Sequence, residues 1–200
     1  MAPRGWFIVF EGVDGSGKST QLDLLSMKLR DQGIDHMLER EPSDGSIGRF
    51  IRDYAEAGER YLSPESEALL FTADRFEHSK RIEIILEQGL TVICDRYYHS
   101  TLAYQGAAGV DVAWLRDLQK FALKPDLVLL LDVDPEWSLM RVSGRTLTVF
   151  ENRNYLKMVR DLYISFAKKG EMRIVDTGRP VDEVEAEVLR LVEELMGVEL

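Results

Sequence analysis

Nine residues near the start of the chain restrict its fold more than any other feature: Gly12-Val13-Asp14-Gly15-Ser16-Gly17-Lys18-Ser19-Thr20. They match the pattern G-x-x-x-x-G-K-[ST], and they lie between an apolar run at 6–10 and a helical pattern that starts near Lys18. In that setting glycines let consecutive backbone N–H groups face one concavity, and the N-terminus of the following helix adds positive potential. The sequence therefore predicts a strand, a phosphate-binding loop and a helix in succession.

The loop supplies the first candidate binding residues. We expect a donor nucleotide to be held by Gly12, Gly15, Ser16, Gly17, Lys18, Ser19 and Thr20. In such loops the lysine reaches the β- and γ-phosphates, and the serine hydroxyl is a ligand of Mg²⁺. The alternative is a glycine-rich turn with a chance lysine, which the flanking strand and helix patterns disfavour.

Short apolar runs alternate with longer amphipathic segments along the rest of the chain. The runs, at 6–10, 34–38, 90–94, 127–133 and 172–175, have the length and composition of buried strands. Helical patterns with recognisable ends cover 18–33, 63–89, 111–122, 151–169 and 180–196. This order predicts an α/β fold, with a five-stranded parallel sheet covered by helices on both faces. The length of 200 residues fits one domain, 1–200.

Charge and cysteine content exclude several classes of protein. The chain has 25 Lys and Arg against 35 Asp and Glu, a formal charge of −10, which disfavours binding to a nucleic-acid polymer. No apolar run is long enough to cross a membrane, and the apolar run near the start is too short for a signal peptide. The single cysteine, Cys94, suits a reducing compartment, so we expect a cytoplasmic protein.

Two further groups of residues lie where a second ligand is expected. Asp95 and Arg96 follow the strand at 90–94, at the edge of the sheet where ligands of such folds bind, although the pair also suits a structural ion pair. Phe71 and Arg75 are four residues apart in one helical segment and face the same way. A ring beside an arginine suits recognition of a nucleobase, but the same spacing is common in a protein core.

Four segments together resemble the thymidylate kinase family, in the order and at the spacing of that family and over nearly the whole chain. They are the loop preceded by Glu11 and followed by Gln21, Arg40-Glu41-Pro42, the stretch 70–75 and the stretch 94–106. The resemblance implies transfer of the γ-phosphoryl group of ATP to dTMP in dTTP synthesis, with Mg²⁺ accompanying ATP. It also implies a P-loop kinase fold with a short lid at about 142–152, and a homodimer.

The resemblance also implies roles for individual residues. Those expected to bind dTMP are Asp14, Glu41, Pro42, Arg52, Phe71, Arg75, Arg96, Ser100, Tyr104 and Gln105. Phe71 would stack on thymine, Arg75 would bond its rim, and Arg96 would bind the acceptor phosphate. Asp14 would contact the 3′-hydroxyl, and Tyr104 would disfavour ribonucleotides. Arg141 and Arg179 would join the ATP site, and Asp95 would hold Mg²⁺ through water beside Ser19.

The lid is where the sequence departs from the family pattern. Gly15 occupies the loop position that carries a basic residue in some members, so the chain resembles the subgroup whose lid supplies a catalytic arginine. Arg141, Arg145 and Arg153 are candidates, and we expect the catalytic set to be Lys18, Asp95, Arg96 and Arg145. The expected Asp-Arg-x-Glu stretch reads Thr148-Val149-Phe150-Glu151.

Two alternatives to a dTMP kinase remain open at this stage. Another small P-loop nucleotide kinase or a deoxynucleoside kinase fits the same loop, and Glu11 or Glu41 could deprotonate a sugar hydroxyl. A nucleotide-binding regulator without turnover fits the altered lid.

Overall fold

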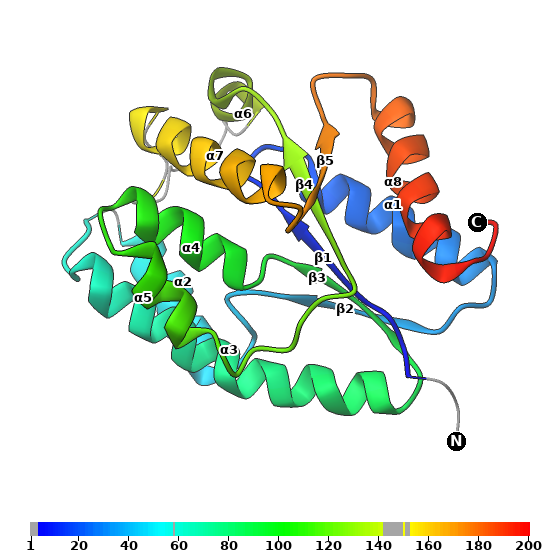
Figure 1. Cartoon of the computed structure of the whole chain (residues 1–200), viewed down its shortest axis with the longest axis horizontal. Helices are drawn as coiled ribbons and strands as arrows, with labels where there is room; N and C mark the ends of the chain where they lie inside the picture. The colour runs from blue at the N-terminus through cyan, green and yellow to red at the C-terminus, as the bar shows by residue number, and fades with distance from the viewer. Residues whose placement is uncertain (1–3, 58, 142–149, 151–152) are drawn as a thin grey trace.

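The structure is a computed structural model, and it describes residues 4–57, 59–141, 150 and 153–200. Its centre is a five-stranded parallel sheet in the order β2-β3-β1-β4-β5 (Figure 1). The strands are β1 (Phe7–Glu11), β2 (His36–Arg40), β3 (Thr91–Asp95), β4 (Leu127–Asp132) and β5 (Arg173–Asp176). The predicted sheet is confirmed, and each strand begins and ends within two residues of its predicted apolar run.

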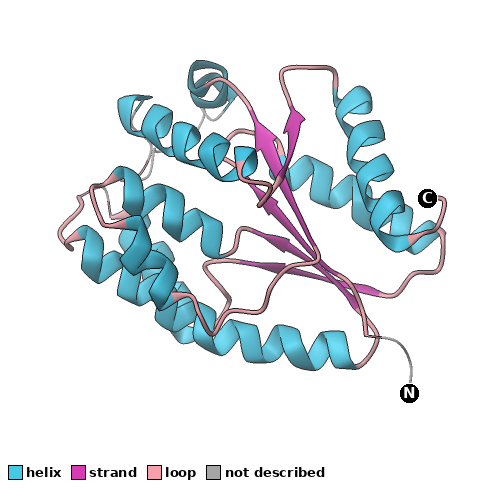
Figure 2. Ribbon diagram, in the orientation of Figure 1, coloured by secondary structure: helices cyan, strands magenta, loops and turns pink. Residues whose placement is uncertain are grey.

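Helices cover both faces of the sheet. Side chains of a strand point alternately to the two faces, so an apolar strand presents an apolar surface on each face. In β1, Phe7 and Val9 belong to a core shared with α3 (Pro64–Glu87), α4 (Tyr98–Ala107) and α7 (Arg153–Lys168). Ile8 and Phe10 belong to a second core shared with α1 (Lys18–Asp31) and α8 (Val181–Met196). Figure 2 shows these two layers of helices on opposite sides of the strands. Burial on both faces explains why the strands are continuous apolar runs.

Among the described residues, three helices lie outside the predicted helical patterns: α2 (Ser46–Glu56), α4 (Tyr98–Ala107) and α6 (Pro135–Arg141). The helix predicted at 111–122 is shorter, since α5 spans Val112–Leu118. Its start is correct because the Asp111 side chain caps it by accepting from the Ala113 N–H. The backbone then leaves the helix before the predicted end, where Ala122 N–H bonds Gln119 O in a turn.

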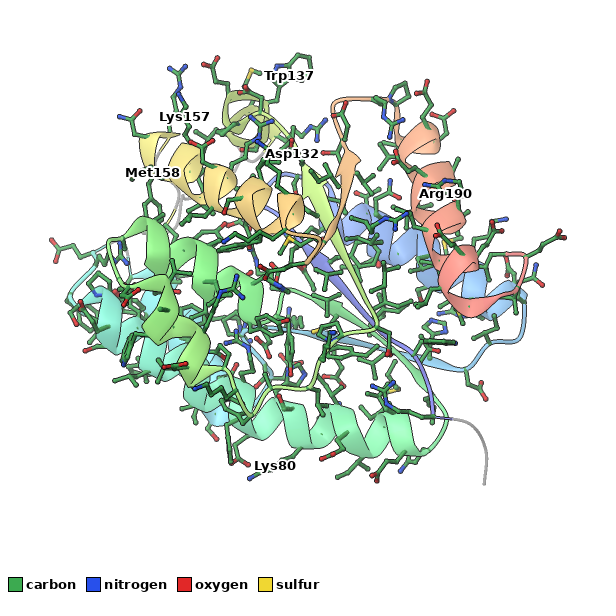
Figure 3. All side chains as sticks on the ribbon, in the orientation of Figure 1. Lys80, Asp132, Trp137, Lys157, Met158 and Arg190 are labelled. Carbon is green, nitrogen blue, oxygen red and sulfur yellow. The ribbon has the colours of Figure 1, made fainter. Side chains whose placement is uncertain are left out.

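The carboxyl ends of the central strands meet at one edge of the sheet, as parallel strands require. The loop of Gly12–Thr20 follows β1, Arg96 follows β3, and Asp132 ends β4. Asp132, which is labelled in Figure 3, lies at this edge. It pairs with Arg160 of α7 at 2.6 Å. Of the helices described, none combines the length and the apolar content needed to cross a membrane.

Candidate functional site

The loop after β1 is shaped by glycines in conformations that other residues rarely adopt. Gly12 has φ 145°, Gly15 has φ 76°, and Gly17, which precedes α1, has φ 93°. No side chain caps the start of α1. The first N–H groups of a helix lack partners within it, so those of α1 are available to an anion such as a phosphate.

Gly15 also lies too close to another segment to carry a side chain. A Cβ atom at this position would be 2.3 Å from the carbonyl oxygen of Ser138 in α6. Together with the positive φ, this contact excludes the basic residue that some relatives are expected to carry here. The loop therefore receives no cation from that position, in agreement with the subgroup that the sequence resembles.

Lys18 is folded back over the loop that precedes it. Its Nζ atom donates to the carbonyl oxygens of Gly12 and Val13, at 3.1 Å each. Burial lowers the pKa of Lys18 below its ordinary value, and the nearby charge of Arg96 lowers it further. The ammonium group thus lies in a poorly solvated position, where a bound polyphosphate would be a favourable partner.

A groove beside the loop brings together the two arginines expected on the donor side. It has a volume of about 210 Å³ and is lined by Ser16, Gly17, Thr20, Gln21, Arg141, Thr177, Arg179, Val181 and Val184. Arg141 donates to the carbonyl oxygens of Gly15, at 3.3 Å, and Thr177, at 3.0 Å. Arg179 forms an ion pair with Glu187. The groove lies directly against the phosphate loop, so it suits the base and sugar of a donor nucleotide.

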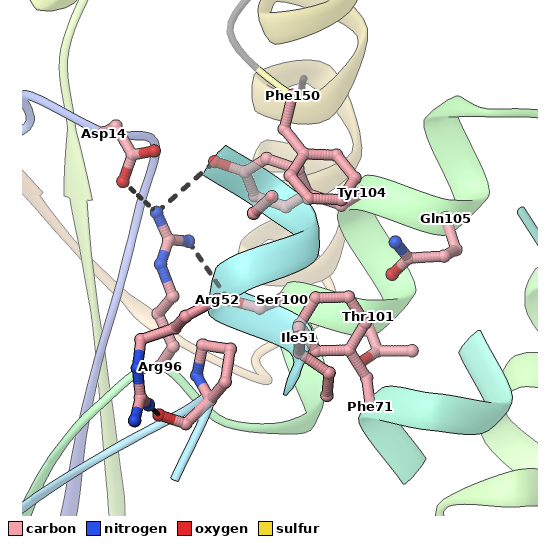
Figure 4. Close-up of a pocket in the computed structure, with 12 residues that line it drawn as sticks. Asp14, Ile51, Arg52, Phe71, Arg96, Ser100, Thr101, Tyr104, Gln105 and Phe150 are labelled. Carbon is pink, nitrogen blue, oxygen red and sulfur yellow. Dashed lines mark hydrogen bonds and ion pairs between the residues drawn. The ribbon is translucent and has the colours of Figure 1, made fainter. Parts of the chain in front are cut away.

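A second cavity, of about 200 Å³, is lined in part by Asp14 of the loop (Figure 4). Its lining contains eight of the ten residues expected to bind dTMP: Asp14, Pro42, Arg52, Phe71, Arg96, Ser100, Tyr104 and Gln105. The other two expected residues, Glu41 and Arg75, are outside the lining, which Ile51, Ala55, Thr101 and Phe150 complete. The residues come from five segments of the chain, which the fold brings to one cavity.

Arg96 connects this cavity to the phosphate loop. Its guanidinium forms an ion pair with Asp14 at 2.6 Å, and it donates to the hydroxyl oxygens of Ser100, at 3.2 Å, and Tyr104, at 3.4 Å (Figure 4). The backbone of Arg96 has φ 71°, an uncommon conformation for a residue with a side chain. Such conformations concentrate at functional sites, and this one places a cation in the wall of the cavity, next to Asp14 of the loop.

Arg75 lies behind the wall of the cavity, in a buried polar network. It pairs with Glu41 at 2.6 Å and donates to Thr101 Oγ1 at 3.1 Å and to Gln119 Oε1 at 2.9 Å. Only 1% of Arg75 is exposed. Its expected bond to a thymine rim stays a prediction, and in this structure it supports the wall residue Thr101.

His78 completes the network on the far side of Glu41. Its ring nitrogens contact Glu41 and Glu39, at 3.1 Å each. Burial alone would lower the pKa of His78, but the hydrogen bonds and charges of Glu39 and Glu41 raise it from 6.5 to about 9. The imidazole is therefore a cation at neutral pH, and with Arg75 it neutralises the buried carboxylates.

The loop that follows Glu41 is fixed from two sides. Asp74 accepts from the N–H of Ser43, at 2.7 Å, and from its hydroxyl, at 2.6 Å. Arg52 donates to the carbonyl oxygens of Pro42, at 2.6 Å, and Ser43, at 2.7 Å. These bonds hold Pro42 and Arg52 at the mouth of the cavity.

Phe150 is a wall residue that the sequence reasoning missed. Its ring lies edge-on to those of Phe71, at 6.4 Å, and Tyr104, at 6.2 Å, and it is buried. In the sequence, the stretch 148–151 is notable only because it departs from the family pattern. The one available signal was an aromatic residue within that stretch.

Of the three candidate lid arginines, Arg141 and Arg153 are among the described residues. Arg145 lies outside the described residues, as do 142–149 and 151–152 of the expected lid. Arg153, the other candidate, begins α7 and forms an ion pair with Glu136 of α6. The choice between the two arginines stays a prediction.

Asp95 and Ser19 carry oxygen atoms of the kind that a magnesium site needs. The Oδ1 atom of Asp95 is buried and has no hydrogen-bond partner among the described residues, whereas Ser19 lies exposed at the start of α1. Oxygen ligands and water are what Mg²⁺ prefers. Among the described residues no group of three or more His, Cys, Asp or Glu side chains forms a separate metal site.

Comparison with known proteins identifies the relatives of the chain. The model of the thymidylate kinase family matches residues 10–188. The probable thymidylate kinase of Pyrococcus horikoshii is 43% identical over 204 residues, which cover 98% of this chain and 100% of the relative. The probable thymidylate kinase of Thermococcus onnurineus is 44% identical over 198 residues, covering 94% and 97%. The thymidylate kinase of Thermomicrobium roseum is 44% identical over 202 residues, covering 96% of each.

Proposed function

Since the chain belongs to the thymidylate kinase family, we propose that it transfers the γ-phosphoryl group of ATP to dTMP, giving ADP and dTDP. One observation of the site carries this proposal. The cavity walled by Phe71 and Tyr104 is also lined by the Asp14–Arg96 ion pair, and Asp14 belongs to the phosphate loop. A monophosphate whose base lies against Phe71 can therefore present its phosphate to Arg96, facing the loop.

Positioning and charge neutralisation supply the catalysis in this mechanism. The acceptor is a phosphate oxygen that is already ionised at neutral pH, so no strong base is needed. Lys18 holds the β- and γ-phosphates, Arg96 holds the acceptor phosphate, and a lid arginine, Arg145, stabilises the transferring group. Preorganised cations of this kind act on the charge spread over the transferring phosphoryl group.

The burial of the two candidate bases argues against a nucleoside acceptor. Glu11 is 0% exposed, and its two oxygens accept hydrogen bonds from Tyr97, Ser100 and Tyr163. Glu41 is bound to Arg75 and His78. A general base must be within hydrogen-bond reach of the proton that it removes, and neither carboxylate lines the cavity.

We infer that Mg²⁺ would be held by Ser19 and, through a water, by Asp95. When bound, the ion would neutralise charge on the β- and γ-phosphates of ATP. Ser19 would offer its hydroxyl as a ligand, and Asp95 would orient a coordinated water through its buried oxygen. We expect EDTA to abolish the activity by chelating the ion, and added Mg²⁺ to restore it.

The assembly that we propose is a cytoplasmic homodimer of a single kinase domain, 1–200. Leu69, Phe76 and Ile84 are exposed apolar residues on one side of α3, and a second copy of the chain would cover them. Light scattering on the purified protein tests the dimer, and a monomer at micromolar concentration contradicts it.

An assay of ADP release with ATP and Mg²⁺ tests the function. The acceptors are dTMP, dUMP, dCMP, dAMP, dGMP, UMP and thymidine. Turnover that strongly favours dTMP supports the proposal. Preference for thymidine or for another monophosphate contradicts the assignment of the acceptor cavity, and binding of both nucleotides without product favours a regulator.

A further inference from the structure

Glu11, the last residue of β1, is a fully buried carboxylate to which the proposed reaction gives no role. Its Oε1 atom accepts from the N–H groups of Tyr97, at 2.9 Å, and Ser100, at 3.2 Å. Its Oε2 atom accepts from the hydroxyls of Ser100, at 2.7 Å, and Tyr163, at 2.8 Å. All four donors belong to segments far from Glu11 in the sequence, so this carboxylate joins three parts of the fold.

The first of these bonds cap helix α4. The residue at its N-cap is Tyr97, whose side chain makes no capping bond, yet a helix start needs acceptors for its first N–H groups. Glu11 supplies them from β1, and a negative charge at that end of a helix is favourable. The Arg96 N–H also bonds the carbonyl oxygen of Phe10, at 2.9 Å. The end of β1 thus fixes residues 96–100, from which the acceptor cavity begins.

A chain of hydrogen bonds continues from Glu11 to the phosphate loop. The Ser100 hydroxyl donates to Glu11 and accepts from Arg96 Nη1, at 3.2 Å, while Arg96 Nη2 contacts Asp14 at 2.6 Å. Asp14 lies three residues after Glu11, so the chain closes on itself through the backbone. The guanidinium of Arg96 is therefore held from both sides, by Ser100 and by Asp14.

We propose that Glu11 is a positioning residue for the acceptor: through Ser100 and the start of α4 it orients Arg96 toward the acceptor phosphate. This inference rests on the proposed function, in which Arg96 binds that phosphate. Glu11 itself touches neither nucleotide, because it lines neither the acceptor cavity nor the donor groove.

Donor binding does not depend on Glu11 in the same way. The shape of the loop comes from the positive φ values of Gly12, Gly15 and Gly17, and Lys18 is held by two carbonyl oxygens of the loop. None of these contacts involves the Glu11 carboxylate. A Glu11 variant that weakens binding of dTMP but not of ATP would therefore indicate a role in positioning Arg96. A variant that disorders the neighbouring loop would weaken binding of both nucleotides.

Steady-state kinetics and calorimetric binding of dTMP and ATP test the proposal with Glu11→Ala and Glu11→Gln. Loss of hydrogen bonds to a charged group is expected to raise the KM for dTMP about tenfold or more and to lower kcat, with the KM for ATP within about twofold. In Glu11→Gln the amide oxygen still accepts from both backbone N–H groups and the NH₂ group can donate to Ser100. This variant should keep the KM for dTMP within about threefold of the wild type.

A matched pair of serine variants keeps the test decisive if Glu11→Ala does not fold. Ser100→Ala removes the link between Glu11 and Arg96, whereas Ser26→Ala removes a buried hydroxyl of α1 that bonds His36. Only Ser100→Ala should raise the KM for dTMP, by about threefold or more. Equal losses for dTMP and ATP, or a KM for dTMP within twofold in both Glu11→Ala and Ser100→Ala, overturn the inference. A wild-type protein that does not phosphorylate dTMP contradicts the proposed function instead.

Discussion

The donor loop and the acceptor cavity meet at the Asp14–Arg96 ion pair, but they are built in opposite ways. The loop is nine consecutive residues, Gly12–Thr20, shaped by glycine conformations and by the start of α1. The cavity is assembled from distant segments and is supported by buried charges, with Glu41 between Arg75 and His78.

Because of this difference, mutations in the two regions should affect different properties of the protein. A buried carboxylate that loses its partner is strongly destabilising, because the remaining charge is neither solvated nor neutralised. The donor loop offers its groups to a ligand, and of its nine residues only Val13 belongs to the hydrophobic core. We therefore expect acceptor-side changes to lower stability, and donor-side changes to lower activity with the fold intact.

The largest expected effect is on the free energy of unfolding of Arg75→Leu. The change leaves Glu41 buried without its arginine and should cost about 3–5 kcal/mol, as measured by urea denaturation. The donor-side control is Arg179→Leu, which removes a partly exposed ion pair with Glu187 and should cost less than about 1 kcal/mol. Equal losses in the two variants would remove the distinction between the regions.

Lys18→Ala should show the reverse pattern, with lost activity and a retained fold. Removing one preorganised cation is expected to lower kcat by about 10²–10³-fold, by analogy with the loss of an oxyanion donor. Because burial disfavours the charged ammonium and lowers the pKa of Lys18, we expect no loss of stability. Turnover near the wild-type value, or a large decrease in the urea midpoint, would contradict this prediction.

His78 makes the stability of the acceptor side depend on pH. Its pKa in the fold, about 9, lies above the ordinary 6.5, so its stabilising contribution is complete below pH 6.5 and is lost as the pH rises through about 9. Between pH 6 and pH 8 the loss should be about 1–2 kcal/mol relative to His78→Gln. Urea denaturation of both proteins at pH 6, 8 and 10 measures it. A constant difference between them across this range would show that the His78 charge does not support Glu41.

The smallest expected effect concerns the aromatic wall. Phe150→Ala removes edge contacts with Phe71 and Tyr104, each of about 0.5–1.5 kcal/mol, and should raise the KM for dTMP about three- to tenfold. The KM for ATP should not change. Trp137→Ala, which removes an exposed ring of α6 outside the cavity, is the control and should leave both constants unchanged.

The parts predicted correctly from sequence depend on local patterns. The strands are continuous apolar runs, because both faces of the sheet are covered, and the loop is one motif between a strand and a helix. Helix α3 was predicted from Ser63, whose side chain caps it by accepting from the Ser66 N–H. In each of these cases the residues that determine the structure are neighbours in the sequence.

The parts that were missed depend on distant partners. Helix α4 begins at a tyrosine and receives its cap from Glu11, 86 residues before Tyr97, so no local signal marks its start. The spacing of Phe71 and Arg75 correctly placed both on one helix, but Glu41, Thr101 and Gln119 draw Arg75 behind the cavity wall. Spacing along a helix gives a direction, whereas the partners met in that direction come from the tertiary fold.

The position of β1 in the sheet has a consequence for the order in which parts of the protein unfold. This strand is buried along its whole length and is bonded on both sides, to β3 and to β4, whereas β2 and β5 are edge strands with exposed residues. Its amide hydrogens should therefore exchange with deuterium only when the whole chain unfolds, while those of the edge strands exchange through local opening. The strand that ends in Glu11 and leads into the donor loop thus belongs to the last part of the molecule to open.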